Sequence, residues 1–143
     1  YLEWADTICN FALYKSSEQA VPNCAYNHPI YASGNRYRGR SVSHTFDNDA
    51  SIYTLGTILT DRKDNMWAVR LGYGNLNRKG VADEANTVAQ VKTRYREVEL
   101  LHRHKTGFGD INLSVGYDYR KNTETNESKG TTRLSLEWVY NVY

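Results

Sequence analysis

The chain has 143 residues, of which 40% are hydrophobic and 24% are charged, and its mean hydropathy is -0.70. It is long enough for one compact domain, and it has no run of roughly 20 apolar residues that would form a transmembrane helix. The 18 basic and 16 acidic residues leave a net charge of only +2, which argues against nucleic acid as the main partner. Twelve tyrosines and three tryptophans exclude a disordered tail.

The chain opens on Tyr1 without the basic and apolar leader of a secretory signal, and its first residues (YLEWADT) already predict a strand. Either a signal peptide has been removed or the chain is a piece of a longer protein, and we expect the piece. Cys9 and Cys24 are its two cysteines, and a disulfide between them would close a loop of about 15 residues and stabilise the fold by roughly 3 kcal/mol. Such a bond fits an oxidising compartment; two reduced and unrelated thiols are the alternative.

Alternating apolar and polar residues predict β-strands along much of the chain. Between Ile111 and Arg120 every second residue is apolar, and the same period of two recurs from Met66 and through the last segment. We predict six strands, near residues 1–8, 50–60, 66–75, 93–103, 110–120 and 131–143. Two short turns, at 61–65 and 104–110, alternate with three long polar connections, at about 10–48, 75–90 and 121–130.

Two architectures fit this pattern: a soluble β-sandwich or small barrel, and an outer-membrane barrel whose apolar face lies in lipid. The apolar rows end in aromatic residues, such as Trp67 with Tyr73 and Trp138 with Tyr140, which is typical of membrane interfaces. The predicted fold class is therefore all-β, an antiparallel transmembrane β-barrel segment of about six strands. The smallest such barrels have about eight strands, so this segment would belong to a larger barrel or assemble with other chains.

One strand carries cations on its outward face. Lys92, Arg94 and Arg96 share the phase of Val98 and Leu100, which places three cations just above a lipid-facing pair. Cations at mid-bilayer would cost several kcal/mol together, so we expect this stretch at the membrane edge, beside lipid phosphates. A β-bulge that exchanges the two faces is the alternative.

Two short motifs have the residue types of metal sites. Asp47, Asn48 and Asp49 are rich in oxygen, but they lack the Gly and the bidentate Glu of an EF-hand, so a turn entering a strand is preferred. His102 and His104 share one strand face, and a solvated edge is preferred to metal binding there. We predict no metal ion and no cofactor.

The stretch from 22 to 51 is the densest run of Tyr, Arg, His, Asn and Asp in the chain. Its motif residues are Tyr26, Asn27, His28, Ile30 and Tyr31, then Arg36, Tyr37, Gly39 and Arg40, then His44, Asp47, Asn48 and Asp49. Together with YLEWADT before it and LGYGNLNR (71–78) after it, this order resembles the capsule assembly Wzi family of outer-membrane proteins. The resemblance covers roughly residues 1–78, and the remainder is similar only to β-barrels in general.

The resemblance implies a large monomeric β-barrel of about 18 strands with a small helical plug. Such a protein holds capsular polysaccharide at the bacterial cell surface as a lectin and has no known enzymatic activity. Residues 1–143 would form the carboxy-terminal part of this one barrel domain, in the outer membrane, with the loop at about 10–48 extracellular. The expected partners are capsular or surface polysaccharide and outer-membrane lipid, including lipopolysaccharide, and not nucleic acid. The plug helices have no counterpart in these residues.

The long loop has the residues that sugar recognition needs. Tyr rings stack on sugar rings, and Arg and Asn donate hydrogen bonds to hydroxyls and to uronic-acid carboxylates. The candidate glycan-binding residues are Tyr26, His28, Tyr31, Arg36, Tyr37, Arg38, Arg40, His44, Asp47 and Asp49. The alternative is that the loop packs on itself, with its arginines paired to its two aspartates.

Two other functions compete with a lectin. One is an outer-membrane hydrolase that uses His44 with Asp47 or Asp49, since some barrel enzymes combine a His with acidic residues. Ser43 cannot assist His44 within one strand, because adjacent strand residues point to opposite faces. The other is a diffusion porin whose lumen is lined by charged residues, namely Arg70, Asp118 and Arg133.

Overall fold

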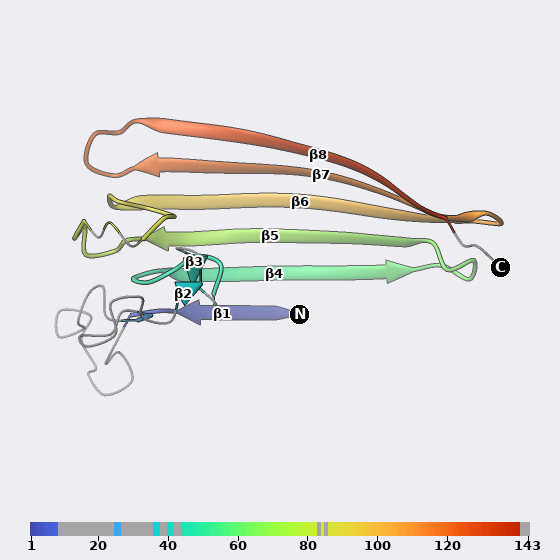
Figure 1. Cartoon of the computed structure of the whole chain (residues 1–143), viewed down its shortest axis with the longest axis horizontal. Coiled ribbons are helices and arrows are strands. Elements are labelled where there is room, and N and C mark those ends of the chain that lie inside the picture. The colour runs from blue at the N-terminus through green and yellow to red at the C-terminus, as the bar shows by residue number, and fades with distance from the viewer. Residues whose placement is uncertain are drawn as a thin grey trace.

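The computed structural model describes residues 1–8, 25–26, 36–37, 40–41, 44–82, 84 and 86–140, with the backbone alone for 36–37 and 40–41. Its strands are β1 (Leu2–Asp6), β2 (Arg36–Tyr37), β3 (Arg40–Ser41), β4 (Ser51–Thr60), β5 (Met66–Leu76), β6 (Thr93–Thr106), β7 (Gly109–Asn122) and β8 (Ser128–Tyr140) (Figure 1). No apolar helix of membrane-spanning length is found among the described residues.

Six of the strands form one antiparallel sheet in the order β1-β4-β5-β6-β7-β8, and β2 pairs with β3 in a separate small hairpin. The prediction of an all-β antiparallel fold with six main strands is confirmed. Within the described residues β1 and β8 each have one neighbour, so the sheet is open. The closed barrel and its strand number stay predictions.

One of the predicted long connections is wrong. Only residues 123–127 separate β7 from β8, whereas the sequence predicted a loop over 121–130. The side chain of Asn122 closes this turn locally, because its Oδ1 accepts the backbone N–H groups of Glu124 (2.9 Å) and Thr125 (3.3 Å). The polar residues on either side therefore stay in the strand ladder, and the strict alternation of short and long connections does not hold.

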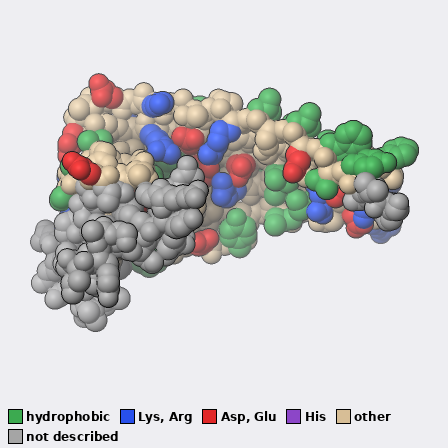
Figure 2. Space-filling model, in the orientation of Figure 1, with side chains coloured by type: hydrophobic (Ala, Val, Ile, Leu, Met, Phe, Trp, Pro, Cys, Tyr) green, Lys and Arg blue, Asp and Glu red, His purple; other side chains and the backbone are tan. Residues whose placement is uncertain are grey.

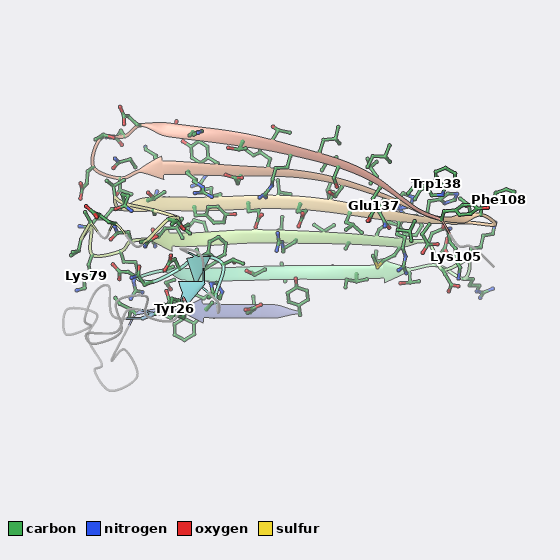
Figure 3. The ribbon with its side chains drawn as sticks, viewed as in Figure 1. Tyr26, Lys79, Lys105, Phe108, Glu137 and Trp138 are labelled. Atoms are coloured by element: carbon green, nitrogen blue, oxygen red, sulfur yellow. The ribbon has the colours of Figure 1, made fainter. Side chains whose placement is uncertain are left out.

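The two ends of the sheet differ in their connections. One end, here called the long-connection end, carries the links 7–50, 77–92 and 123–127. The opposite, short-turn end carries 61–65 and a turn of only Gly107 and Phe108, shorter than predicted. Figure 3 shows Lys79 and Tyr26 near the first end and Phe108 and Trp138 at the second.

The sheet has one apolar face that no described segment covers. Directly opposed residues of antiparallel strands lie on the same face, so the register places the apolar residues of all strands together. The central members of this apolar face are Leu55, Leu71, Val98, Leu100, Leu113, Val115, Leu134 and Leu136. All are exposed, from 37% for Val98 to 74% for Leu136. A sheet that shows its apolar side chains in this way is the inverse of a soluble sandwich.

Aromatic residues lie at both ends of the apolar face, as predicted. Tyr73 and Trp67 are six residues apart on β5, or about 20 Å along the strand. This is of the order of the roughly 25 Å apolar band of outer-membrane proteins. Towards the long-connection end Trp4 stacks with Tyr53 (6.2 Å between ring centroids), and towards the short-turn end Trp67 stacks with His102 (5.0 Å).

The opposite, polar face carries a charge network of three arginines and three carboxylates: Arg70, Glu97, Glu99, Asp118, Arg120 and Arg133. Arg70 contacts Glu97 at 3.2 Å and Glu99 at 2.9 Å. Arg133 contacts Glu97 at 2.7 Å and Asp118 at 3.8 Å, and Arg120 contacts Asp118 at 3.4 Å. Figure 2 shows acidic and basic side chains interspersed over the middle of the sheet. The network joins β5, β6, β7 and β8.

The buried core lies on the polar face at the long-connection end. It contains Ala50, Ile52, Leu76, Ala89 and Tyr95, with Phe46 and Val88 packed against it. The rings of Phe46 and Tyr95 meet edge to face at 4.9 Å, and Arg120 donates a hydrogen bond to the carbonyl of Val88 (3.2 Å). The stretches 44–50 and 77–92 therefore fold back over this end of the polar face.

Candidate functional site

The candidate site at the long-connection end stands on a buried polar cluster, here called the loop base: Thr7, Asp47, Asn48, Asp49, Asn77 and Asn86. Its residues come from both ends of the connection 7–50 and from the connection 77–92. Asp47, Asp49 and Asn77 have positive φ angles, from 47° to 62°, which Asp and Asn tolerate better than most residues. The sequence uses these residue types because the backbone bends sharply there.

Thr7 joins the end of β1 to the stretch before β4. Its hydroxyl donates to the carbonyl of Asp47 (2.7 Å) and accepts the N–H of Ala50 (2.9 Å), while its own N–H donates to the carbonyl of Ala50 (2.9 Å). These buried bonds hold the loop exit against the first strand. The prediction that residues 47–49 form a turn entering a strand is confirmed.

Asn86 joins the β5–β6 connection to the same base. Its Nδ2 donates to Oδ1 of Asn48 (2.7 Å), and its Oδ1 accepts the N–H groups of Val88 (3.0 Å) and Ala89 (3.1 Å). All the polar atoms of the Asn86 side chain are therefore used inside the protein. The residue is structural, and it is not accessible to a ligand.

Asp49 is the one member of the loop base with a buried carboxylate oxygen that lacks a hydrogen bond to any described residue. Its Oδ2 accepts the N–H of Lys79 (3.0 Å), while its buried Oδ1 has no hydrogen-bond partner among the described residues. Burial raises the pKa of the Asp49 carboxyl above its ordinary value, although the N–H of Lys79 and the charge of Arg78 act in the opposite direction. The ionised carboxylate is thus less favoured in the folded protein than in the unfolded chain.

This gives a prediction for Asp49→Asn. A carboxyl with a raised folded pKa favours folding at low pH, and that contribution is lost as the pH rises from about 4 through the folded value. Asp49→Asn removes this loss, keeps an acceptor for Lys79 and tolerates the positive φ, so at pH 7 it should be at least as stable as the parent. Asp49→Ala should instead lose about 1 to 2 kcal/mol, because it removes the acceptor. Urea unfolding of the full-length protein in detergent at pH 4 and pH 7 measures both. A less stable Asn variant at pH 7 would contradict the argument.

The structure brings some of the predicted glycan-binding residues together. The hydroxyl of Tyr26 is hydrogen-bonded by the backbone of His44 and lies near Asp47, and burial raises the Tyr26 pKa. The first and last parts of the motif are therefore in contact. Arg36 and Tyr37 of β2 pair with residues 40–41 of β3, so this part of the loop forms a tight hairpin. Figure 1 shows the hairpin at the same end of the sheet as the β5–β6 connection.

Other predicted residues fall outside the described part of the chain. They are His28, Tyr31 and Arg38 among the glycan candidates, and Cys9 and Cys24 of the expected disulfide. The side chains of Arg36, Tyr37 and Arg40 are likewise not described, so the alternative pairing of the loop arginines with Asp47 and Asp49 stays untested. Asp47 and Asp49 themselves are buried, with relative exposures of 1% and 0%.

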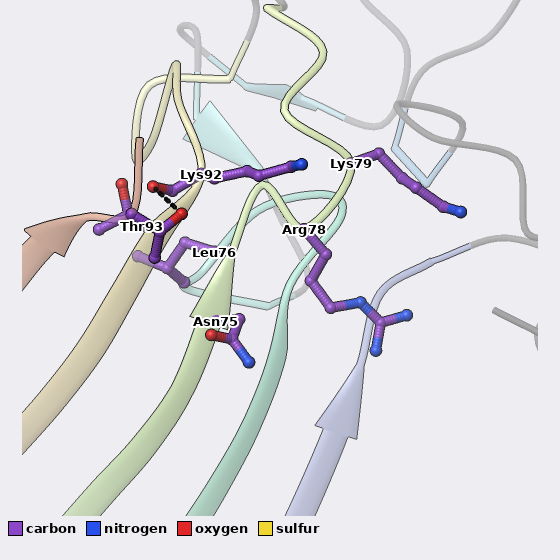
Figure 4. A pocket seen from close by; sticks show the side chains of 7 residues that line it. Asn75, Leu76, Arg78, Lys79, Lys92 and Thr93 are labelled. Carbon is purple, nitrogen blue, oxygen red and sulfur yellow. Dashed lines mark hydrogen bonds between the residues drawn. The ribbon is translucent and has the colours of Figure 1, made fainter. Parts of the chain in front are cut away.

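A basic pocket lies beside the loop base, and sequence reasoning did not find it. It has a volume of about 340 Å³ and is lined by Asn75, Leu76, Arg78, Lys79, Lys92, Thr93 and Thr123. Figure 4 shows six of these side chains at the end of β5, in the connection that follows and at the start of β6, and Thr123 comes from the connection after β7. Pockets of roughly 300 Å³ and more hold small ligands in other proteins.

The charges of this basic pocket are only partly balanced. Arg78 pairs with Asp6 (3.1 Å), while Lys79 and Lys92 form no ion pair with any described residue. The aliphatic part of Lys92 packs against Gly80, where an added Cβ would lie 3.0 Å from Cε of Lys92. Gly80 also has a φ of +71°, a conformation that glycine adopts without strain. Lys92 is therefore held at the pocket. The sequence predicted that it would continue the outward row of Arg94 and Arg96, and it does not.

The structure bears on both alternative functions, the hydrolase and the porin. Nδ1 of His44 accepts the backbone N–H of Phe46 (3.3 Å), so that nitrogen does not donate to Asp47 or Asp49 as a catalytic dyad would require. The porin candidates Arg70, Asp118 and Arg133 all lie on the polar face, but each is engaged in the charge network. No cluster of three potential metal ligands exists among the described residues.

The fold and site together define an all-β protein with an exposed apolar sheet face, a charged face and a folded polar base beneath its long connections. The chain belongs to the family of the capsule assembly protein Wzi, whose family model matches residues 1–135. The match continues past residue 78, where the resemblance in the sequence ended, and extends through β6 and β7 into β8. The family assigns the chain a role in capsule assembly. No curated protein and no solved structure gives a significant match.

Proposed function

We propose that this chain retains capsular polysaccharide at the cell surface, as a non-enzymatic, lectin-like outer-membrane protein of capsule assembly. The observation that carries the proposal is the basic pocket, in which Lys79 and Lys92 have no ion-pair partner among the described residues. An acidic capsule presents a carboxylate on many of its sugars, and a lysine ammonium binds such a group by charge-assisted hydrogen bonds. Each contact is weak, but many repeats on one polymer give high avidity.

The two sheet faces support the membrane location. The exposed apolar face would lie in lipid, and the aromatic residues at its ends would lie at the two interfaces. Open sheet edges are costly in lipid, so the sheet would close with further strands into a monomeric barrel of about 18 strands. The long-connection end would then be extracellular, and residues 1–143 would be the carboxy-terminal part of the barrel.

The loop that bears the family motif would complete the glycan site. We propose sugar contacts by its Tyr, His and Arg residues, namely Tyr26, His28, Tyr31, Arg36, Tyr37, Arg38, Arg40 and His44. The buried Asp47 and Asp49 would instead fix the base from which this loop rises. A second hollow of about 660 Å³, lined in part by Arg120 and Lys129, shares Thr93 with the basic pocket. The two hollows would offer an extended surface to a polymer.

The test is a pair of double variants of the full-length protein in encapsulated cells. Lys79→Ala with Lys92→Ala should release polysaccharide into the medium, with a several-fold fall in the cell-attached fraction, because two charge-assisted contacts per repeat are lost. The measurement is the ratio of cell-attached to free uronic acid, at equal surface abundance of the protein. Arg36→Ala, Arg38→Ala and Arg40→Ala together test the loop in the same assay.

The matched control is Arg62→Ala with Lys63→Ala, which removes two exposed cations from the short-turn end. This variant should retain polysaccharide as well as the parent. If the pocket variant retains it equally well, the pocket plays no part in binding. If both double variants release it equally, the effect is one of net charge, and the proposed site is wrong.

A further inference from the structure

A second group of cations lies on the apolar face, where a soluble protein would not place them. Arg94 and Arg96 stand opposite Asn75 and Tyr73 of β5, in a register that continues without interruption to Val98 and Leu100. The alternative β-bulge is therefore wrong, and both arginines point outward with the lipid-facing residues. Lys121, opposite Arg94 on β7, joins them on the same face.

These outward cations are not balanced by any carboxylate in the part of the chain that the structure describes. No carboxylate among the described residues forms an ion pair with Arg94, Arg96 or Lys121, whereas every arginine of the charge network on the polar face is paired. The outward positions of β4 to β8 carry no acidic residue, and the one on β1, Asp6, is paired with Arg78 (3.1 Å). The apolar face thus has a local excess of positive charge, confined to its long-connection end.

An apolar groove lies directly beside these cations. It has a volume of about 410 Å³ and is lined by Arg96, Glu97, Val98, Tyr117 and Tyr119. The ring of Tyr117 leans over Gly130 of β8, where an added Cβ would overlap the phenol. The ring is thus directed away from β6, and the groove lies on the apolar face above β6 and β7. One end of the groove is thus cationic, and Val98, Tyr117 and Tyr119 supply aliphatic and aromatic walls, while the side chain of Glu97 belongs to the opposite, polar face.

The position of these cations along the strands matches the expected level of lipid headgroups. Arg96 stands in the same cross-strand row as Tyr73 and Tyr119, and this row of aromatic residues is where the membrane interface is expected. Arg94 and Lys121 lie one row further towards the long-connection end. Val98 and Leu100 continue towards the middle of the apolar face. A molecule with phosphates above and acyl chains below fits this order.

We propose that this face binds a phosphorylated lipid of the outer leaflet, with its phosphates on Arg94, Arg96 and Lys121 and one acyl chain in the groove. Guanidinium groups grip phosphate oxygens in a bidentate manner, and the tyrosines at the groove pack against the lipid sugar and upper chain. The inference rests on the proposed membrane location, but it is independent of polysaccharide binding. The bound lipid would seal the sheet to the surrounding leaflet.

The test measures binding of lipid A to the full-length protein in detergent micelles, by native mass spectrometry. Lipid A with both phosphates should bind more tightly than the dephosphorylated lipid. Arg94→Gln with Arg96→Gln should weaken binding of the phosphorylated lipid roughly 30-fold, from about 1 kcal/mol per cation, and leave the dephosphorylated lipid unaffected. Arg96→Lys should lose less, because it keeps the charge. Arg62→Gln with Lys63→Gln, at the other end of the sheet, should bind like the parent.

Three outcomes would overturn the assignment. One is equal binding of phosphorylated lipid A by the folded Gln variant and the parent. Another is full competition by inorganic pyrophosphate at lipid concentrations, which would mean that the groove contributes nothing. The third is release of polysaccharide from cells by the Gln variant, which would place these arginines in the glycan site. A failure of the pocket variant Lys79→Ala with Lys92→Ala to release polysaccharide would affect only the proposed function.

Discussion

Given the proposed membrane location, replacing Val115 by lysine should destabilise the folded protein in lipid by about 2 to 4 kcal/mol, the cost of a lysine near the bilayer midplane on the lipid side of a barrel. Val115 is exposed in the middle of the apolar face, opposite Leu100 on β6 and Leu134 on β8. Its neighbours along and across the strands are apolar, so the ammonium would have neither a carboxylate nor water within reach. In a soluble sheet exposed in the same way, this substitution would cost almost nothing.

Ser114 provides the matched control for this prediction. It precedes Val115 on β7 and points to the polar face, where its hydroxyl forms a hydrogen bond with that of Ser135 (2.7 Å). Ser114→Lys loses this exposed bond and places its charge among polar neighbours, so its cost should stay within about 1 kcal/mol. Urea unfolding of the full-length protein in lipid vesicles compares the two variants. Equal costs for Val115→Lys and Ser114→Lys would show that the apolar face is not in lipid.

The strands and the two faces of the sheet could be predicted because both follow from a period of two in the sequence. Alternation from Ile111 to Arg120 placed Leu113 and Val115 on one side and Asp118 on the other, and the structure agrees. Strand ends were less predictable. Residues such as Asn122 are common in loops, but here the Asn122 side chain closes a short turn and its neighbours stay paired. The hydrogen bonds of the Asn122 side chain set the end of β7, and the hydropathy pattern contains no signal for them.

The basic pocket and the charge network could not be predicted because they depend on register. Lys79 and Lys92 lie near the two ends of one connection. They line the same pocket because Leu76 pairs with Thr93. Glu97 lies between Arg70 and Arg133 because the pairing of β5 through β8 is continuous. A shift of one residue would have exchanged the faces. A search for cations at both ends of a connection between paired strands would have found the pocket.

Replacing Glu97 by alanine should cost about 2 kcal/mol, the second largest effect expected from a single substitution here. Its Oε1 accepts hydrogen bonds from both Arg70 (3.2 Å) and Arg133 (2.7 Å), and its side chain is only 6% exposed. Loss of a carboxylate from a fully buried pair costs roughly 3 to 5 kcal/mol. The arginine side chains are about half exposed, at 44% and 51%, so water replaces part of the lost interaction.

Glu99 is the control within the same network. Its single ion pair among the described residues is with Arg70 (2.9 Å), its side chain is 32% exposed, and Arg70 keeps Glu97 when Glu99 is removed. Glu99→Ala should therefore cost less than about 1 kcal/mol, as exposed ion pairs do. Urea unfolding of the full-length protein in detergent measures both. Equal costs for the two alanine variants would mean that the burial of Glu97 has no energetic weight.

A double-mutant cycle with Arg133→Met separates the ion pair from the packing of Glu97. Methionine keeps much of the aliphatic part of Arg133 without the charge, so this single variant leaves Glu97 with Arg70 alone. If the two residues are coupled, Glu97→Ala combined with Arg133→Met should cost about 1 kcal/mol less than the sum of the single variants, because both single variants lose the same short ion pair. Additive costs would mean that the short Glu97–Arg133 ion pair makes no net contribution to the free energy of unfolding. In that case the charge network would position the strands' polar face without stabilising it, and the stability of this sheet would have to come from its hydrogen-bond ladder and its apolar face in lipid.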